Sequence, residues 1–297
     1  AIQGKNYRLF DFVEGSTLQQ VQQPAQARMA AQAYGKFASW SQQLSAAAFE
    51  ETIPNFHRLD LRFARLQEVA KQPPSLPEEE QALLQGYLAQ LPLVNWYQEQ
   101  RNHLPLRVTH SDTKINNLIF SKSLSHVEAV VDLDTVMGGY LMYDFGDLVR
   151  TVACSLPETS TEWEQIREIP ELFEELLAGY LEGLNGAMTP LESKSLLLGG
   201  EIMTLIMGLR FLTDHLEGNV LHPLRSVRIA THRWASRELE KGEDVATTGI
   251  QKDMHVRVVF ARGGDSILGE SNGEFHAEHI AIELDGLARV VAAVGHR

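Results

Sequence analysis

The sequence predicts an α+β fold in which a mostly helical body carries a small β element. Three short strand patterns, over residues 105–109, 118–120 and 127–132, surround a polar loop. Helical periodicity fills most of the remaining chain, above all from Asp144 to about Glu240. After Gly242 the pattern changes to strands separated by glycine-containing turns, which predicts a β-rich segment attached to the helical body.

The N-terminal part is predicted to form a strand followed by a long helix. Residues from Tyr7 to Val13 alternate and are aromatic, as in a strand, and Gly15 lies in the turn that ends it. Apolar residues then recur at three- and four-residue spacing from Leu18 to Leu44, which is typical of an amphipathic helix. We expect Pro24 to lie near the start of this helix or to divide it.

Two further helices follow from composition and spacing. After a proline-rich linker over residues 71–77, three consecutive glutamates, Glu78 to Glu80, suit the positively polarised start of a helix. The most apolar stretch of the chain, Leu196 to Leu212, is interrupted by Glu201 and Arg210. It is therefore predicted to be a buried helix and not a membrane span.

Composition restricts the class of protein. The chain has 297 residues, of which 44% are hydrophobic, so it can bury a sizeable core. Its net charge of −13 argues against broad nucleic-acid binding, and we expect neither a nucleic-acid nor a membrane partner. The single cysteine, Cys154, cannot form an intramolecular disulfide and is expected to be a small buried residue, which fits a cytoplasmic location.

The polar loop from Val108 to Phe120 has the pattern His-x-Asp-x-x-x-x-Asn, and an apolar strand that ends at Asp132 follows it. This order is typical of the catalytic loop and metal-binding strand of kinase-like phosphotransferases. Their chemistry needs an aspartate, here Asp112, to orient the acceptor hydroxyl and take its proton late in transfer. It also needs oxygen ligands, here Asn117 and Asp132, to hold Mg²⁺ against the phosphates of ATP.

Three other residues of this segment are candidates with less defined roles. Lys114 follows Asp112 by two residues and could neutralise charge on the transferred phosphoryl group. We group His110 with the catalytic residues, although we expect it to brace the loop by hydrogen bonds more than to transfer a proton. Asp134 either contacts a second metal ion or braces the loop. The alternative for the whole motif is a polar turn in which Asp and Asn only cap the chain.

On these residues, the chain resembles the aminoglycoside phosphotransferase/choline kinase family, a branch of the protein-kinase-like fold. In that family the metal-binding aspartate is followed by a glycine and a second aspartate, which Gly139 and Asp144 match here. The run Asp144-Phe145-Gly146 imitates the metal-binding Asp-Phe-Gly of protein kinases. The resemblance instead makes Asp132 the metal ligand and gives Asp144 a structural role as a cap of the following helix.

Several motifs are most similar to bacterial N-acetylhexosamine 1-kinases. They are the loop with Thr113-Lys114-Ile115-Asn116-Asn117, the run from Asp132 to Met137, Tyr143 to Asp147, Ile53 to His57, and Arg210 to Gly218. The resemblance implies phosphorylation of an N-acetylhexosamine at the anomeric position, with ATP as donor and Mg²⁺ as cofactor. Other kinases of small alcohols, acting on aminoglycosides, choline or homoserine, remain alternatives.

A sugar pocket could use Phe56, His57, Arg62, Arg210 and Asp214, because an aromatic face and paired polar groups suit a pyranose. Each residue also has a plain structural interpretation. Phe56 could be a core residue, His57 a hydrogen-bonded partner within the fold, and Arg62 a solvated charge on a helix. Arg210 and Asp214 are four residues apart and could form an ion pair along one helix.

The resemblance divides the chain into three parts. Residues 1–15 resemble the hinge strand between kinase lobes, where Phe10, Asp11, Phe12 and Val13 would bind adenine. Residues 16–242 resemble a protein-kinase-like C-terminal lobe, and the N-terminal lobe is expected to be largely absent from this chain. Residues 243–297 form a β-rich appendage of unknown role. Gly263 and Gly264 are candidates for a displaced phosphate loop, and a truncated, non-catalytic binding protein is the alternative function.

Overall fold

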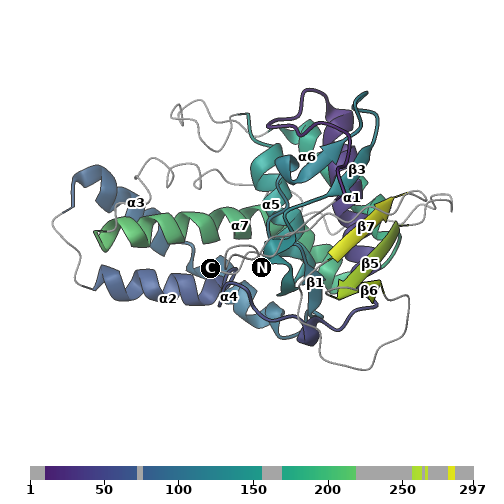
Figure 1. The fold of residues 1–297 in the computed structure, drawn as a ribbon. Coiled ribbons are helices and arrows are strands. Elements are labelled where there is room, and N and C mark those ends of the chain that lie inside the picture. The colour runs from purple at the N-terminus through teal and green to yellow at the C-terminus, as the bar shows by residue number, and fades with distance from the viewer. Residues whose placement is uncertain are drawn as a thin grey trace, which may run out of the picture.

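The computed structural model describes residues 11–71, 76–155 and 169–218, together with three strands between Val256 and Leu284. The helices are α1 (Pro24–Ser41), α2 (Leu59–Ala70), α3 (Glu78–Leu88), α4 (Leu91–Arg101), α5 (Leu141–Val152), α6 (Pro170–Leu184) and α7 (Pro190–Leu216). The strands of the body are β1 (Arg107–Thr109), β2 (Leu118–Phe120), β3 (Val127–Val130) and β4 (Met137–Gly139). The predicted α+β body, mostly helical with small antiparallel sheets, is confirmed (Figure 1).

The four short strands form two antiparallel pairs around the polar loop. Strand β1 pairs with β4, with Val108 opposite Gly138, and β2 pairs with β3, with Leu118 opposite Val130. One 3₁₀ turn, Ile115–Asn117, lies directly before β2, and a second, Leu133–Thr135, lies between β3 and β4. The strand patterns at 107–109, 118–120 and 127–130 agree with the prediction, and each strand buries apolar residues, alternating strictly with less buried ones in β2.

Helix α1 begins later than the apolar spacing alone indicates. Pro24 is its first residue, and a capping box between Gln23 and Gln26 satisfies the first amide groups. Leu18 lies outside the helix, although it is buried in the same core. The expectation that Pro24 lies near the start of the helix is confirmed, while the part of the helical pattern from Leu18 to Gln23 is not helical, since Pro24 fixes the start.

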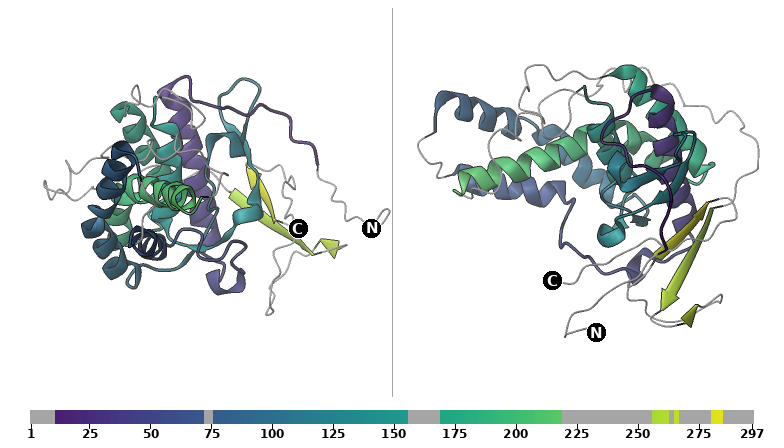
Figure 2. Two further views of the ribbon diagram at one scale, coloured as in Figure 1. Left: turned by 90° about the vertical axis from the view of Figure 1, so that its left-hand side faces the viewer. Right: turned by 45° about the horizontal axis from the view of Figure 1, so that its top comes forward.

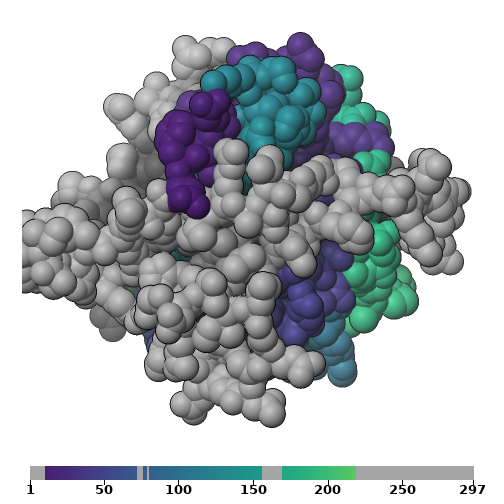
Figure 3. All heavy atoms as spheres, turned by 45° about the vertical axis from the view of Figure 1, so that its right-hand side comes forward, coloured from purple at the N-terminus to yellow at the C-terminus, as the bar shows by residue number. Residues whose placement is uncertain are grey.

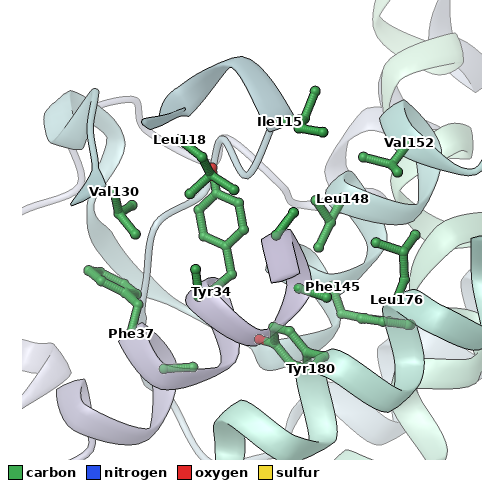
Figure 4. Close-up of a cluster of buried hydrophobic side chains, with 14 of the residues drawn as sticks. Tyr34, Phe37, Ile115, Leu118, Val130, Phe145, Leu148, Val152, Leu176 and Tyr180 are labelled. Atoms are coloured by element: carbon green, nitrogen blue, oxygen red, sulfur yellow. The ribbon is translucent and has the colours of Figure 1, made fainter. Parts of the chain in front are cut away.

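One hydrophobic cluster joins α1, the β2–β3 pair, α5 and α6 (Figure 4). Tyr34 and Phe37 come from α1, Phe145 and Leu148 from α5, and Tyr180 from α6; the Tyr34 ring points towards Leu118, and the Phe145 ring lies beside that of Tyr180. All six side chains are buried. Each large buried side chain of this kind contributes about 2 kcal/mol of hydrophobic stabilisation, so this cluster holds the β2–β3 pair against the helices.

Helix α7 runs through the middle of the helical body, with α2 and α3 on its flank (Figure 1). The left view of Figure 2 looks along this green helix and shows other helices around it. Among the described residues α7 alone is long and apolar enough to cross a membrane, but 72% of its apolar window is buried inside the molecule. This agrees with the expectation of a buried helix over residues 196–212.

The start of α7 is fixed to the sheet region by a buried ion pair. A capping box of Thr189 and Glu192 begins the helix. The carboxylate of Glu192 also accepts two hydrogen bonds, each 2.8 Å long, from the guanidinium of Arg107 in β1. Because Glu192 is only 1% exposed, this two-point pair is a strong and specific link between α7 and β1.

Helices α5 and α7 touch backbone to backbone. A Cβ atom added to Gly146 would lie 2.1 Å from the carbonyl oxygen of Gly199. No side chain fits into that space, so glycine at position 146 is required for the close approach of the two helices. This contact places α5, and the residues on it, at a fixed distance from α7.

The segment before α1 differs from the prediction. Residues 11–13 are not a strand, and Phe12 is 83% exposed. A single bridge pairs Ser16 with Phe120 at the edge of β2, where each backbone amide donates to the other residue's carbonyl oxygen. Figure 3 shows this purple segment against the teal hairpin. Strand β2 has three residues, so its edge offers little length for a partner. The part of the expected strand over residues 7–10 lies outside the described residues.

The predicted β-rich tail contains an antiparallel sheet. Strand β5 (Val256–Arg262) pairs with β6 (Asp265–Ser266) on one side and with β7 (Ile280–Leu284) on the other. These strands agree with the alternating Val and Ile residues of the sequence. Strand β5 lies beside α1 and β7 beside β3 (Figure 1). Gly263 and Gly264 are outside the described residues, and the proposed boundaries at 15 and 242 remain predictions.

Candidate active site

Asp112 lies at the centre of a short hydrogen-bonded loop between β1 and β2. Its Oδ1 is 3.0 Å from Nζ of Lys114, and its Oδ2 accepts a 3.0 Å hydrogen bond from Nδ2 of Asn117. The same Asn117 amide group donates to the backbone carbonyl of Asp112 at 2.8 Å. The three residues that the loop motif predicts are therefore in contact, and the carboxylate of Asp112 is held at both oxygens.

His110 is buried and braces this loop through both ring nitrogens. Nε2 donates to the carbonyl oxygen of Val131 at 3.0 Å, and Nδ1 accepts a 3.3 Å bond from the amide of Asp112. Burial lowers the pKa of His110, which keeps the ring neutral, as this donor–acceptor pattern requires. With both nitrogens engaged, His110 positions Asp112 and is not itself placed to transfer a proton.

Asp144 holds the catalytic loop from α5. Its two carboxylate oxygens accept 2.8 Å hydrogen bonds from the amides of His110 and Ser111. Ser111 has a φ of 65°, a left-handed conformation that is uncommon for a serine and is fixed here by the bond to Asp144. We expected Asp144 to cap its own helix, but this is wrong, because the N-cap of α5 is Tyr140. It is a structural residue that caps the loop, because the loop amides lie above the first turn of α5.

Asp132 and Asp134 lie between β3 and β4, at the start of and within the 3₁₀ turn Leu133–Thr135. Asp132 follows β3 in a left-handed conformation, with φ 61° and ψ 57°, which turns the chain sharply into the 3₁₀ turn containing Asp134. Partial burial raises the pKa of Asp132, and the negative charges of Asp112 and Asp134 raise it further. Three carboxylates therefore act on one another electrostatically at this site.

This donor set fits a magnesium ion that is shared with a nucleotide. Among the described residues, no three His, Cys, Asp or Glu side chains are close enough to hold a metal ion by themselves. Magnesium in nucleotide sites takes only one or two carboxylates and completes its shell with phosphate oxygens and water. Asp132 and the side-chain oxygen of Asn117 match that need, and the mutual repulsion of the carboxylates would be relieved by a cation.

A second group of side chains forms a pocket between α2 and the end of α7. Its volume is about 340 Å³, and it is lined by Pro54, Asn55, Leu61, Arg62, Arg65, Arg210, Thr213, Asp214 and Glu217. The guanidinium of Arg210 lies 5.4 Å from the ring centre of Phe56, which stacks on His57 at 4.2 Å. Of the residues predicted for a sugar pocket, Arg62, Arg210 and Asp214 line this pocket, while Phe56 and His57 pack next to Arg210 and do not line it.

His57 connects this pocket to the catalytic loop. Its ring packs edge-on against Tyr143 of α5, with ring centres 5.2 Å apart. Burial, together with the positive charges of Arg210 and Arg150, lowers the pKa of His57 to about 3, so the ring is neutral. Tyr143 immediately precedes Asp144, so adjacent residues of α5 contact the pocket and the loop.

The family comparison agrees with this geometry. The model of the phosphotransferase enzyme family matches residues 1–190, which is more than half of the chain. The chain belongs to the phosphotransferase enzyme family. Its expected resemblance to that family is confirmed, while the closer link to N-acetylhexosamine 1-kinases remains a prediction.

Solved structures with a similar fold include two kinds of small-molecule kinase. Choline kinase from Cryptosporidium parvum Iowa II is 14% identical with a TM-score of 0.45, covering 73% of this chain and 67% of that chain. Spectinomycin phosphotransferase in complex with ADP and spectinomycin is 12% identical with a TM-score of 0.40, covering 75% and 73%.

Three residues near this phosphotransferase site were given no role by the sequence analysis. Tyr34 of α1 donates a 2.8 Å bond to the carbonyl of Lys114, and its ring packs edge-on against His110. The pair Asp147 and Arg150 is buried on α5, where Nε and a terminal nitrogen of Arg150 both donate to Oδ1 of Asp147. The run Tyr143 to Asp147 was noted for its resemblance, but an aromatic residue such as Tyr34 carries no signal of its own.

The residues expected to bind adenine are only partly described. Asp11 and Phe12 are exposed and Val13 is buried, while Phe10 lies outside the described residues. Gly15 lies against β2, where an added Cβ atom would be 2.3 Å from the carbonyl oxygen of Phe120. The segment is therefore anchored to the hairpin after the catalytic loop, and its role in nucleotide binding remains a prediction.

Proposed function

We propose that this phosphotransferase transfers the γ-phosphoryl group of ATP to a hydroxyl of a sugar of the N-acetylhexosamine type. The observation that carries the choice of acceptor is the pocket between α2 and α7, where Arg62 and Arg210 present guanidinium groups and Arg210 packs on the Phe56 ring. The hydroxyl groups and the acetamido oxygen of such a sugar can accept hydrogen bonds from guanidinium groups. Choline and aminoglycosides carry positive charge, which two partly buried arginines disfavour.

The loop residues have the roles that this transfer needs. Asp112 orients the acceptor hydroxyl and accepts its proton as the hydroxyl oxygen bonds to the γ-phosphorus and the bond to the leaving ADP breaks. Lys114, 3.0 Å from Asp112, neutralises charge on the transferred group. Asn117 keeps the carboxylate of Asp112 in place. When bound with ATP, magnesium would supply charge neutralisation at the phosphates, held by Asp132 and Asn117, with Asp134 beside them.

The test is phosphoryl transfer by the 297-residue chain with ATP and Mg²⁺. N-acetylglucosamine, choline and an aminoglycoside are offered separately, ADP release is measured, and ³¹P NMR of the product identifies the phosphorylated position. We expect turnover with the sugar, phosphate at the anomeric carbon, and much weaker turnover with the two cationic acceptors.

Asp112→Asn tests the assignment of the base. We expect turnover to fall by about 10³-fold, the usual range for a lost general base, while thermal unfolding stays the same. Glu68→Gln is the control, because it removes one negative charge from an exposed ion pair on α2. Turnover by Asp112→Asn within a few-fold of the unmodified chain would refute the base role. ATP binding without transfer to any acceptor would support the alternative of a non-catalytic binding protein.

A further inference from the structure

The pocket between α2 and α7 has an excess of positive charge, although the chain as a whole has a net charge of −13. Three arginines line it, Arg62 and Arg65 from α2 and Arg210 from α7, against two acids near the end of α7, Asp214 and Glu217. The sign of the charge in this pocket is therefore opposite to that of the net charge of the chain. A partly enclosed site with this sign concentrates negatively charged groups.

The two acids do not neutralise the three arginines. Arg65 forms an ion pair with Glu217 at the exposed rim. The remaining carboxylate, Asp214, acts on both Arg62 and Arg210 and raises the pKa of each. Burial nevertheless lowers the pKa of both arginines, and the charge of Arg210 lowers that of Arg62 further. Two partly buried guanidinium groups thus share one carboxylate.

The hydrogen bonding of these two arginines is incomplete. A guanidinium has five N–H donors. Arg62 donates to the carbonyl of Phe56 over 3.4 Å, and its Nε is buried with no hydrogen-bond partner among the described residues. Arg210 donates to the sulfur of Met207 at 3.6 Å and lies over the Phe56 ring. Planar or tetrahedral anions, with several acceptor oxygens, are the groups that would satisfy such donors.

We propose that Arg62 and Arg210 bind an anionic substituent of the acceptor, a carboxylate, sulfate or phosphate ester carried on the sugar. The inference rests on the proposed function, which places the acceptor hydroxyl at Asp112. The anionic substituent would then be carried on a different carbon of the sugar from the reacting hydroxyl. The pocket selects sugar acids and sugar esters over neutral sugars by charge-assisted hydrogen bonds.

Binding without turnover tests the inference. Isothermal titration calorimetry without ATP compares glucuronate with glucose, and N-acetylglucosamine 6-sulfate with N-acetylglucosamine. We expect each anionic sugar to bind at least tenfold more tightly than its neutral partner. Arg62→Gln should remove this preference, and Arg62→Lys, which keeps the charge but not the two-point geometry, should keep part of it.

Two control variants separate the pocket from general charge. Arg28→Gln removes the same charge from α1, where Arg28 pairs with Glu182 and Glu175, and should leave the preference unchanged. Arg65→Gln changes a pocket residue that already has a partner in Glu217, and should have a smaller effect than Arg62→Gln. Equal losses in Arg28→Gln and Arg62→Gln would refute the assignment to Arg62.

Inorganic sulfate distinguishes a sugar-borne anion from a free one. Sulfate that competes with glucuronate and is weakened by Arg62→Gln supports a shared site. Sulfate binding with no binding of either anionic sugar would overturn the acceptor part of the inference. Efficient phosphorylation of neutral sugars with no preference for anionic ones would refute the inference and leave the proposed function standing. Arg62-dependent binding of anionic sugars by a chain that transfers no phosphoryl group would support the inference and refute the proposed function.

Discussion

The catalytic loop and the arginine pocket are held in different ways, although both touch α5. In the loop, the carboxylates of Asp112 and Asp144 and both nitrogens of His110 have hydrogen-bond partners between 2.8 and 3.3 Å away. In the pocket, Arg62 and Arg210 rely on bonds of 3.4 and 3.6 Å and on an aromatic face. The loop is organised before any ligand binds, which lowers the activation free energy of the reaction, because no groups need to reorganise in the transition state. In the pocket, Nε of Arg62 is buried without a hydrogen-bond partner among the described residues.

Among the variants that test this difference, Asp144→Ala is expected to change the free energy of unfolding most. The change leaves the amides of His110 and Ser111 buried without an acceptor, and each such loss costs about 1–3 kcal/mol. We expect the free energy of unfolding to fall by about 3 kcal/mol in urea denaturation. Asp60→Ala removes an aspartate that pairs with the partly exposed Arg58, and should cost about 1 kcal/mol or less. Equal losses would show that the loop is not held by Asp144.

The pH dependence of stability gives a second, smaller test of the same residue. Burial raises the pKa of Asp144 from 3.8 to about 7, against the lowering effect of the two amide bonds. Between these values the folded chain binds a proton that the unfolded chain does not, so stability falls as pH rises. This contribution is full below pH 3.8, is lost as pH rises to about 7, and stays constant above that.

Urea denaturation from pH 4 to 8 measures this slope, with Asp144→Asn as the comparison because it cannot titrate. The stability difference between the unmodified chain and Asp144→Asn should shrink up to about pH 7 and then level off. A difference that grows with pH over this range would mean that the carboxylate is stabilised and not destabilised by its burial.

The smallest effect is expected at Tyr143, where the two regions meet. Its hydroxyl is 2.5 Å from that of Tyr97, which also donates to the carbonyl of His57. Tyr143→Phe removes one buried hydrogen bond and should cost about 1 kcal/mol. Because Tyr143 packs on His57, we expect KM for the acceptor to rise a few-fold with little change in kcat. A lower kcat at unchanged KM would place Tyr143 with the loop and not with the pocket.

The catalytic loop could be predicted from sequence because its information is local. His110, Asp112, Lys114 and Asn117 lie within eight consecutive residues, and the short strands beside them have clear alternating patterns. The role of Asp144 could only be anticipated in part. Its partners, His110 and Ser111, are more than thirty residues away in the sequence, so a cap of its own helix was the nearest local interpretation.

The pocket and the N-terminal segment show where local patterns are insufficient. Arg62 and Arg210 come from α2 and α7, and both were candidates for a sugar pocket, but no spacing in the sequence indicates that two such distant charges lie together. Residues 11–13 alternate like a strand but are not one, since among the described residues before α1 only Ser16 pairs with the short edge of β2. Both outcomes depend on tertiary packing, which a single sequence does not encode in its periodicity.

The contact of Gly146 with Gly199 has a mechanical consequence. Two helices that meet at their backbones have no layer of side chains between them to absorb a displacement. Helix α7 carries Arg210 at one end, and α5 carries Asp144 one turn or less from the contact. The contact therefore fixes the distance between the helix that carries Arg210 and the helix whose Asp144 holds the amides of His110 and Ser111.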